Sequence, residues 1–296
     1  MGCGVLKIAY YPGCTVKTTA KNFEISTLAV ARELGIEMIE IPNWTCCGTV
    51  FSLSTDDVMH HIAPIRNLIR VQEMGYDRVV TICSMCFNTL KRANVLVKED
   101  REKLNTINLF MNEEEDYRAE VTVYHLLEIL KNDIGFDEVA KHVKKPLKGL
   151  KVVPYYGCLL VRPKGIGIDD VENPLIMHDL LKALGADVID DPFKIECCGA
   201  YHTVDNKNLV AERTYKIISS TKSRGGDVLV LSCPLCDYNL DFRQKETLAL
   251  HPEFQQMPVM YFTQLMALAF GLGEEYLGFE YHYVDPRPIL KEKNLL

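Results

Sequence analysis

The sequence has no hydrophobic run long enough to cross a bilayer. Its longest nearly apolar stretch, Tyr261 to Leu272, is too short and contains Thr263 and Gln264. It also lacks an excess of positive charge, because 33 Lys and Arg residues stand against 40 Asp and Glu residues, which gives a net charge of −7. A protein that wraps a polyanion normally has the opposite sign. These absences exclude a membrane span and argue against nucleic acid as a partner.

The N-terminus lacks an export signal, because residues 1–4 contain no apolar segment followed by a cleavage site. In a reducing compartment, thiols gathered in Cys-x-x-Cys pairs are typically metal ligands or redox centres rather than cross-links. The composition, 48% hydrophobic and 25% charged, is that of a globular protein and excludes wholesale disorder. We therefore expect a cytoplasmic protein with free thiols and, from its 296 residues, one large domain or two.

Cysteine is abundant, with eleven residues, and ten of them fall into two copies of one pattern. Each copy has a cysteine after Tyr-Pro-Gly or Tyr-Tyr-Gly, then a Cys-Cys-Gly motif, then a Cys-x-x-Cys motif. The copies are offset by 144, 151 and 150 residues at these three motifs, so their order is kept while the loops differ. The repeat predicts two homologous lobes, residues 1–146 and 147–296. The eleventh cysteine, Cys3, has no counterpart, and we expect it to bind no metal.

Short β-branched runs alternate with helical patterns in each half. The expected strands of the first half cover residues 7–11, 37–41, 78–82 and 121–124, and the repeat places their counterparts in the second half. Helical spacing brings four apolar residues to one face: Val58, Ile62, Ile65 and Ile69. Strands alternating with helices imply a parallel sheet covered on both sides. We predict an α/β fold of two homologous lobes, each a mainly parallel sheet flanked by helices, related by a pseudo-two-fold axis.

Five cysteines in each copy follow the carboxyl ends of predicted strands, where open α/β sheets place their ligands. The five thiols of a copy should therefore converge at one edge. Structural zinc and an ordinary four-iron cubane each take four protein ligands, so five thiols leave one over. Inert buried thiols would not recur five at a time in register. The favoured interpretation is an iron–sulfur cluster in both halves, and a zinc site in one or both halves is the alternative.

This doubled motif resembles the cysteine-rich CCG domain family, whose pattern is Cys, about 31 to 39 residues, Cys-Cys, about 35 residues and Cys-x-x-Cys. Two intact copies without a ferredoxin segment are similar to the B subunits of heterodisulfide reductases from methanogenic archaea. The resemblance implies that each copy binds a non-cubane 4Fe-4S cluster through five cysteinates. The implied ligands are Cys14, Cys46, Cys47, Cys83 and Cys86 for one cluster and Cys158, Cys197, Cys198, Cys233 and Cys236 for the other.

The resemblance further implies a reaction, the reduction of the mixed disulfide of coenzyme M and coenzyme B to two thiols. Each cluster would deliver one electron. The sequence lacks a ferredoxin-type cysteine run and a flavin fingerprint, so electrons must arrive from other proteins. By family analogy these partners are a flavin-containing subunit, a small iron–sulfur subunit with two cubane clusters and, upstream, a hydrogenase or formate dehydrogenase.

Two rival functions stay open. The chain could be the CCG-domain electron-transfer subunit of a succinate, lactate or glycolate oxidoreductase, although such chains usually carry a fused ferredoxin region or an altered motif. It could also be a zinc-stabilised scaffold without catalytic activity. Substrate assays separate the first rival from disulfide reduction, and metal analysis separates the second.

Coenzyme M carries a sulfonate and coenzyme B a phosphate, so an acidic protein needs local cations to bind their disulfide. Lys17 and Lys21 follow Cys14, and Arg162 and Lys164 follow Cys158, where the rim of the pocket is expected. For any one of them, a solvated surface charge is the simpler interpretation. His202, four residues past Cys198, is a candidate proton donor, and a hydrogen-bonded histidine without a chemical role is the alternative.

Overall fold

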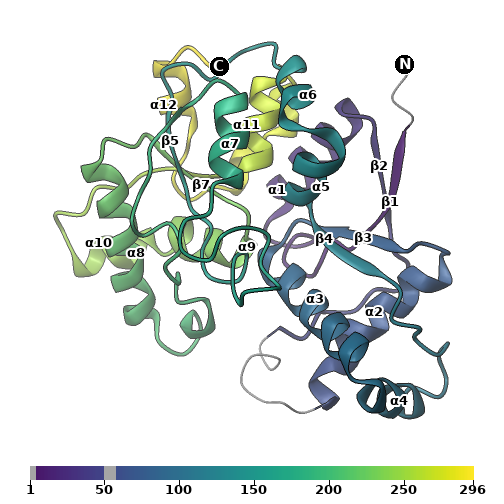
Figure 1. Cartoon of the computed structure of the whole chain (residues 1–296). Coiled ribbons are helices and arrows are strands. Elements are labelled where there is room, and N and C mark those ends of the chain that lie inside the picture. The colour runs from purple at the N-terminus through teal and green to yellow at the C-terminus, as the bar shows by residue number, and fades with distance from the viewer. Residues whose placement is uncertain (1–4, 50–57) are drawn as a thin grey trace.

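The computed structural model describes residues 5–49 and 58–296. It contains two four-stranded sheets, each built from one half of the chain (Figure 1). The first has the order β2-β1-β3-β4 and the second the order β6-β5-β7-β8. All pairs of neighbouring strands are parallel. The predicted α/β fold of two similar lobes is therefore confirmed, and both lobes share one strand order.

The N-terminal lobe alternates strands and helices as the sequence pattern predicts. Its strands lie within about one residue of the expected ranges: β1 Leu6–Tyr10, β2 Ile36–Glu40, β3 Arg78–Thr81 and β4 Thr122–His125. Its helices are α1 Lys21–Glu33, η1 Val58–His61, α2 Ile62–Glu73, α3 Ser84–Glu99, α4 Arg101–Phe110, α5 Leu126–Ile129, η2 Leu130–Ile134 and α6 Phe136–Lys141. The expected helix at Val58 thus begins with a 3₁₀ turn.

The C-terminal lobe repeats this arrangement and adds a longer tail. Its strands are β5 Lys151–Pro154, β6 Asp187–Val188, β7 Val228–Leu231 and β8 Val259–Tyr261. Its helices are α7 Ile176–Ala183, η3 Ala200–His202, α8 Lys207–Ser223, α9 Pro234–Asp237, η4 Tyr238–Phe242, α10 Gln244–Leu250, α11 Phe262–Ala269, η5 Glu274–Tyr276, η6 Phe279–Tyr281 and α12 Arg287–Glu292. The η4 segment is a π-helix, whereas the N-terminal lobe has one uninterrupted helix, α3, at this place.

Helices cover both faces of each sheet, so the central strands are buried along most of their length. All four residues of β7 are buried, as are Val79 and Val80 of β3. A strand buried on both faces has no solvent side on which polar residues could alternate, which explains the continuous β-branched runs in the sequence. The carboxyl ends of these strands hold the functional loops.

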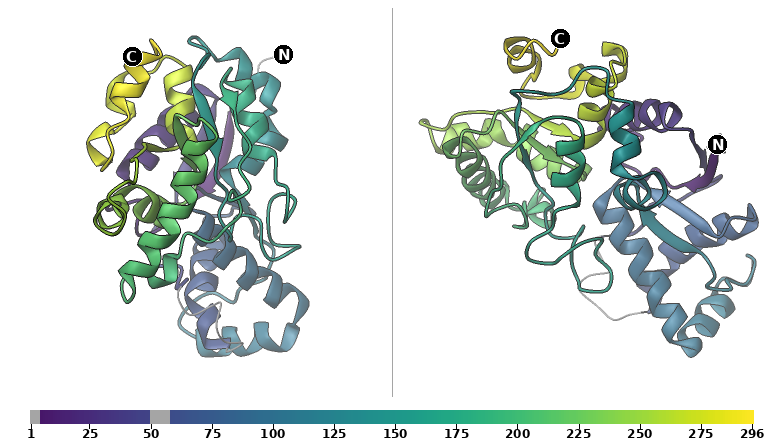
Figure 2. Two further views of the ribbon diagram at one scale, coloured as in Figure 1. Left: turned by 90° about the vertical axis from the view of Figure 1, so that its left-hand side faces the viewer. Right: turned by 45° about the horizontal axis from the view of Figure 1, so that its top comes forward.

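The C-terminal tail joins the two lobes. Helix α1 of the first lobe packs against α11, η5 and η6 of the second (Figure 2). The ring of His282 accepts hydrogen bonds from the amides of Asn22 and Gln264, at 3.3 and 2.8 Å. Asp241 accepts the backbone N–H groups of Tyr283 and Val284. The closing segment that contains His282, Tyr283 and Val284 is thus held by hydrogen bonds within the chain.

Among the helices in residues 5–49 and 58–296, none is long and apolar enough to cross a membrane.

Candidate iron–sulfur site

The ten repeated cysteines lie beyond the carboxyl ends of the strands, eight of them in loops and two, Cys86 and Cys236, in the helices α3 and α9. Cys14 follows β1, Cys46 and Cys47 follow β2, and Cys83 lies between β3 and α3, where it caps the helix. The second lobe repeats each position, and Cys233 caps α9. All ten are free thiols. Because parallel strands end at a common edge, each set of five is brought to one side of its sheet.

In the N-terminal lobe the five thiols form a chain of contacts. The sulfurs of Cys14 and Cys46 lie 3.9 Å apart, and those of Cys47 and Cys86 lie 3.6 Å apart. Cys46 lowers the pKa of Cys47, and Cys47 and Cys83 raise that of Cys86, so these thiols also lie close together. Cys14 and Cys46 are exposed, while the other three thiols are buried. The set therefore runs from the surface into the core.

The C-terminal lobe repeats these contacts with its own residues. The sulfurs of Cys198 and Cys236 lie 3.4 Å apart. Cys197 raises the pKa of Cys158, and Cys198 and Cys233 raise that of Cys236, so these thiols are neighbours as well. Here the outer pair, Cys158 and Cys197, is only partly exposed. The structure thus gathers all ten predicted ligands into two sets with the same internal pairing.

The two sets meet between the lobes. Cys83 and Cys233, which occupy equivalent places in the repeat, lie close enough to shift each other's pKa: Cys233 raises the pKa of Cys83, while Cys236 and Cys83 lower that of Cys233. Next to them, Ser84 Oγ lies 2.9 Å from Ser232 Oγ, and the Ser84 backbone N–H donates to the Ser232 carbonyl. Proximity of equivalent residues is the pattern of a two-fold relation. The buried inner ends of the two sets therefore lie side by side between the lobes.

Glycine precedes the first cysteine of each set because the neighbouring thiol leaves no room for a side chain. A Cβ on Gly13 would lie 2.8 Å from the Cys86 sulfur, and one on Gly157 would lie 3.3 Å from the Cys236 sulfur. Both glycines also have positive φ, at 79° and 64°, which L residues rarely adopt. The Gly-Cys motif thus allows the first loop to approach the Cys-x-x-Cys turn.

Two tyrosines that the sequence analysis did not single out hold the Cys-Cys-Gly loops in place. Tyr11 donates its hydroxyl to the Thr45 carbonyl at 2.8 Å, and Tyr155 donates to the Glu196 carbonyl at 2.6 Å. Each accepting residue directly precedes a Cys-Cys pair. Burial raises the pKa of both phenols, so they stay protonated donors at neutral pH. The repeated Tyr-x-Gly-Cys pattern was the available signal for this role.

The thiols share protons in a way that suits metal binding. The pKa of Cys14 is raised, chiefly because its thiol hydrogen-bonds Cys46 and is partly buried. Conversely, the hydrogen bond from Cys158 lowers the pKa of Cys197 to about 6. Five adjacent thiols cannot all ionise without a compensating cation, since each new charge repels the others. Bound iron would supply that charge and displace the shared protons, so the donor set fits an iron–sulfur cluster.

Within residues 5–49 and 58–296, no group of three or more His, Cys, Asp or Glu side chains is arranged to hold a single metal ion.

A cleft of about 530 Å³ lies at the junction of the lobes and touches the N-terminal set at Cys14. From the second lobe it is lined by Leu235, which stands between Cys233 and Cys236 in the sequence. Its wall also carries the hydroxyls of four threonines, two apolar or aromatic side chains and two cations: Thr15, Thr18, Thr19, Thr203, Val204, Tyr238, Lys207 and Arg243. The cleft can therefore hold a partly apolar, anionic molecule beside Cys14.

The four cations singled out from the sequence lie around the first loops of the two sets. Lys17 forms ion pairs of 2.7 Å with Glu24 and with Glu40. Lys21 begins α1 and is exposed, and so are Arg162 and Lys164. None of the four belongs to the described residues that line the cleft, where Lys207 and Arg243 supply the positive charge.

The candidate proton donor, His202, is also exposed. It ends η3 next to the cleft residue Thr203, and its Nδ1 lies 3.6 Å from a carboxylate oxygen of Asp205. Cys3, expected to bind no metal, lies outside the described residues.

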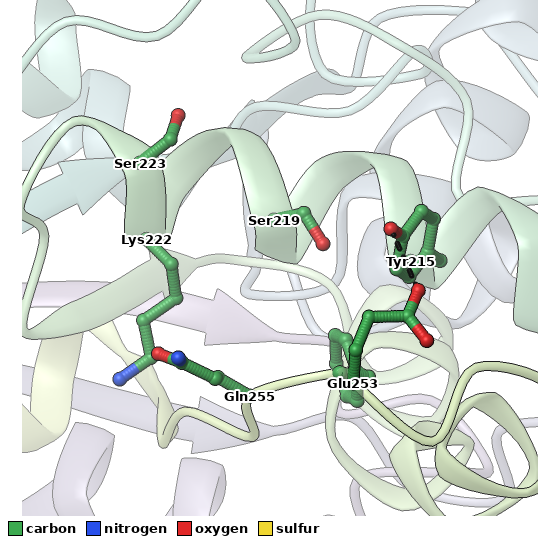
Figure 3. Close-up of a pocket in the computed structure, with 7 residues that line it drawn as sticks. Tyr215, Ser219, Lys222, Ser223, Glu253 and Gln255 are labelled. Atoms are coloured by element: carbon green, nitrogen blue, oxygen red, sulfur yellow. Dashed lines mark hydrogen bonds between the residues drawn. The ribbon is translucent and has the colours of Figure 1, made fainter.

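A second cleft, of about 270 Å³, lies on the other side of the C-terminal lobe, between α8 and the loop that precedes β8 (Figure 3). Polar side chains such as Lys222, Ser223 and Gln255 line it, and Tyr215 donates its hydroxyl to Glu253 across it. None of the residues lining it is a cysteine. The C-terminal set has a small cavity of its own, of about 20 Å³, which all five of its cysteines line together with Ser84 and Met85 of the first lobe.

Comparison with known proteins agrees with this geometry. The model of the cysteine-rich CCG domain matches residues 8–91 and 152–241, one match in each lobe. The chain is 32% identical to an 8-methylmenaquinol:fumarate reductase membrane anchor subunit of Wolinella succinogenes, over 94% of this chain and 97% of the relative. It is 27% identical to the B subunit of a ferredoxin/F420H2-dependent CoB-CoM heterodisulfide reductase of Methanosarcina acetivorans, over 94% of each chain.

Among solved structures, a hypothetical protein from Helicobacter pylori superposes with a TM-score of 0.72 at 12% identity, over 94% of this chain and 51% of that one. This likeness concerns the fold alone. The two matches to the family model, together with the two five-cysteine sets, place the chain in the cysteine-rich CCG domain family. Its relatives support an iron–sulfur electron-transfer subunit of a reductase complex.

Proposed function

We propose that the chain is the disulfide-cleaving subunit of a heterodisulfide reductase. The observation that carries this proposal is the pair of hydrogen bonds between Ser84 and Ser232, the direct neighbours of Cys83 and Cys233, which brings the two sets together at one place. A disulfide has two sulfur atoms, and each would face one set. Two sets on opposite faces could not serve the same small molecule.

The chemistry requires two electrons and two protons for each disulfide, whose S–S bond breaks to give two thiols. Two non-cubane 4Fe-4S clusters, one in each set, would supply one electron each when bound. The chain's own residues hold the clusters through ten thiolates, orient the disulfide in the cleft and provide protons. His202 is the proposed proton donor, because its neighbour Thr203 lines the cleft.

The proposed substrate is the mixed disulfide of coenzyme M and coenzyme B. Its sulfonate and phosphate call for cations, and its aliphatic chain calls for apolar contact. The cleft offers the exposed ammonium of Lys207, the guanidinium of Arg243 and the side chains of Val204 and Leu235. Arg243 is buried and already paired with Glu246, so Lys207 is the better anion contact. We keep Lys17, Lys21, Arg162 and Lys164 as contacts proposed for the rim.

The electrons would come from partner subunits. We infer a flavin-containing subunit, a small iron–sulfur subunit and, upstream of both, a hydrogenase or formate dehydrogenase. A relative from Methanosarcina mazei is named as the B subunit of a ferredoxin:CoB-CoM heterodisulfide reductase, which supports this class of complex.

The test is metal analysis followed by an activity assay, both without oxygen. We expect about eight irons and eight sulfides per chain, from two four-iron clusters. With reduced viologen as the electron donor, the chain should cleave the mixed disulfide. Metal content dominated by zinc, or full iron without cleavage, contradicts the proposal.

A second candidate is an electron relay between a quinone and a fumarate- or succinate-reducing partner. The 32% identity to the Wolinella succinogenes protein favours it. On this alternative, the iron-loaded chain would exchange electrons with a quinol and leave the mixed disulfide unchanged. Running the disulfide assay and a menaquinol assay on one preparation separates the two functions.

A further inference from the structure

One buried side chain outside the cysteine motifs contacts a thiol of the C-terminal set. Asn239 lies in the π-helix η4, three residues after Cys236, and it is fully buried. Its Nδ2 lies 3.1 Å from the Cys198 carbonyl oxygen and 3.6 Å from the Cys198 sulfur. A single amide nitrogen thus faces both the backbone and the thiol of one proposed ligand.

The neighbours of Asn239 fix which end of the amide faces the sulfur. A carbonyl oxygen only accepts hydrogen bonds, so the atom that faces the Cys198 carbonyl is the amide nitrogen. On the other side, the Thr203 hydroxyl donates to Asn239 Oδ1 at 2.7 Å. The Thr214 hydroxyl donates to the Asn239 backbone carbonyl and holds the π-helical turn in place. The amide is therefore preorganised to donate an N–H group to sulfur.

The N-terminal lobe has a different residue at this place. The offset of 150 residues between the Cys-x-x-Cys motifs makes Thr89 the counterpart of Asn239. The Thr89 hydroxyl hydrogen-bonds the Met85 carbonyl at 2.9 Å and the Thr49 hydroxyl at 3.0 Å, both of them oxygen atoms. The side-chain donor to sulfur at this position thus belongs to the C-terminal lobe.

We propose that Asn239 is a positioning residue that raises the reduction potential of the iron–sulfur cluster in the C-terminal lobe. A hydrogen bond to a ligand sulfur stabilises negative charge on the cluster, and the reduced cluster carries one more negative charge than the oxidised one. In a site from which water is excluded, such a bond has a larger effect. The inference rests on the proposed function only because it requires a bound cluster.

The test is a redox titration of the full chain, followed by electron paramagnetic resonance, with Asn239→Leu as the variant. Leucine has a similar volume and no hydrogen-bond donor. The reduction potential of the C-terminal cluster should therefore become more negative, while that of the N-terminal cluster stays unchanged. Asn239→Thr, which introduces the residue of the other lobe, should shift the same potential and serves if the leucine variant does not fold. The matched control, Thr89→Val, should change neither potential.

A second measurement distinguishes an effect of Asn239 on the reduction potential from a purely structural role. In deuterium oxide, the Asn239 variants should show one coupled exchangeable deuteron fewer than the unaltered chain at the C-terminal cluster, while the Gly199 N–H that donates to the Cys197 sulfur keeps its signal. The inference is overturned if iron-loaded Asn239 variants keep the reduction potentials of the unaltered chain. It is also overturned if both Asn239→Leu and Asn239→Thr lose half of their iron. A chain that binds no iron overturns the proposed function as well, whereas a shifted potential without disulfide cleavage overturns the proposed function alone.

Discussion

The two lobes share their strand order and their thiol pairing, but they differ in how deeply the thiols lie. The outer pair of the N-terminal set, Cys14 and Cys46, is exposed, while Cys158 and Cys197 of the C-terminal set are only partly so. The C-terminal set also has the π-helix η4 beside it, with the amide of Asn239 on Cys198. The repeated motif thus gives a more open site in the N-terminal lobe and a more enclosed site in the C-terminal lobe. The two sites adjoin at Cys83 and Cys233.

The largest expected effect comes from removing a thiol at the junction. Cys83→Ser and Cys233→Ser should each lower the iron content by about four per chain, because each removes a ligand of one cluster. Both should lower the rate of disulfide cleavage at least about 100-fold, since altering even the partners of ligands typically costs 10- to 100-fold. Iron analysis and the disulfide assay measure these effects.

The control for this comparison is Cys3→Ser, which should keep the full iron content. If either junction variant loses the iron of both lobes, the two sets are not separate binding units, and the comparison between lobes fails.

A second, smaller effect concerns one histidine in each lobe, the buried His125 and the half-buried His282. Burial lowers the pKa of His125 and of His282 to about 4, compared with about 6.5 in the unfolded chain. Below pH 6.5 the unfolded state therefore binds more protons than the folded state, so stability is complete above pH 6.5 and falls as the pH approaches 4. Each histidine should contribute up to about 3 kcal/mol to this loss.

Denaturant unfolding between pH 4 and 7.5 measures this loss for the native chain, His125→Gln and His282→Gln. Each substitution should remove its own share of the pH dependence. Because His282 binds Asn22 across the lobes, a pH profile unaltered in His282→Gln would mean that the tail does not hold the lobes together.

The smallest effect separates the two tyrosine hydrogen bonds. In Tyr11→Phe the Thr45 carbonyl keeps a second donor, the Asn67 amide at 3.0 Å. Among the described residues, the Glu196 carbonyl accepts a side-chain hydrogen bond from Tyr155 alone. Tyr155→Phe should therefore cost about 1 to 2 kcal/mol of unfolding free energy and Tyr11→Phe about 0.5 kcal/mol. Equal losses of unfolding free energy in the two variants, measured by chemical unfolding, would show that the two tyrosine hydrogen bonds stabilise their loops equally.

The repeat made the fold and the grouping of the cysteines predictable. Apolar runs buried on both faces predict parallel strands, and cysteines placed after such strands must gather at the edge where the strands end. The predicted strand ranges of the first half agree with the structure to within about one residue. For example, β1 covers Leu6–Tyr10, and the predicted range was 7–11. These features depend on local patterns that the sequence carries directly.

Contacts between the lobes were beyond such reasoning. The pairing of Ser84 with Ser232, and that of Asn22 with His282, joins residues 148 and 260 positions apart, and no local period marks them. The π-helix η4 was also missed, because its sequence differs little from that of an ordinary helix. Lys17 shows the same limit, since its partner Glu40 lies 23 residues away on a separate strand. Side-chain partners of this kind depend on how finished elements pack.

The most direct test of the central claim, that both thiol sets serve one site, is an oxygen-free crystal structure of the chain soaked with the mixed disulfide. The account predicts iron at both five-cysteine sets and density for the disulfide, or its two thiols, in the region between them. Iron at sets that open onto opposite faces, with the disulfide elsewhere or absent, would contradict it.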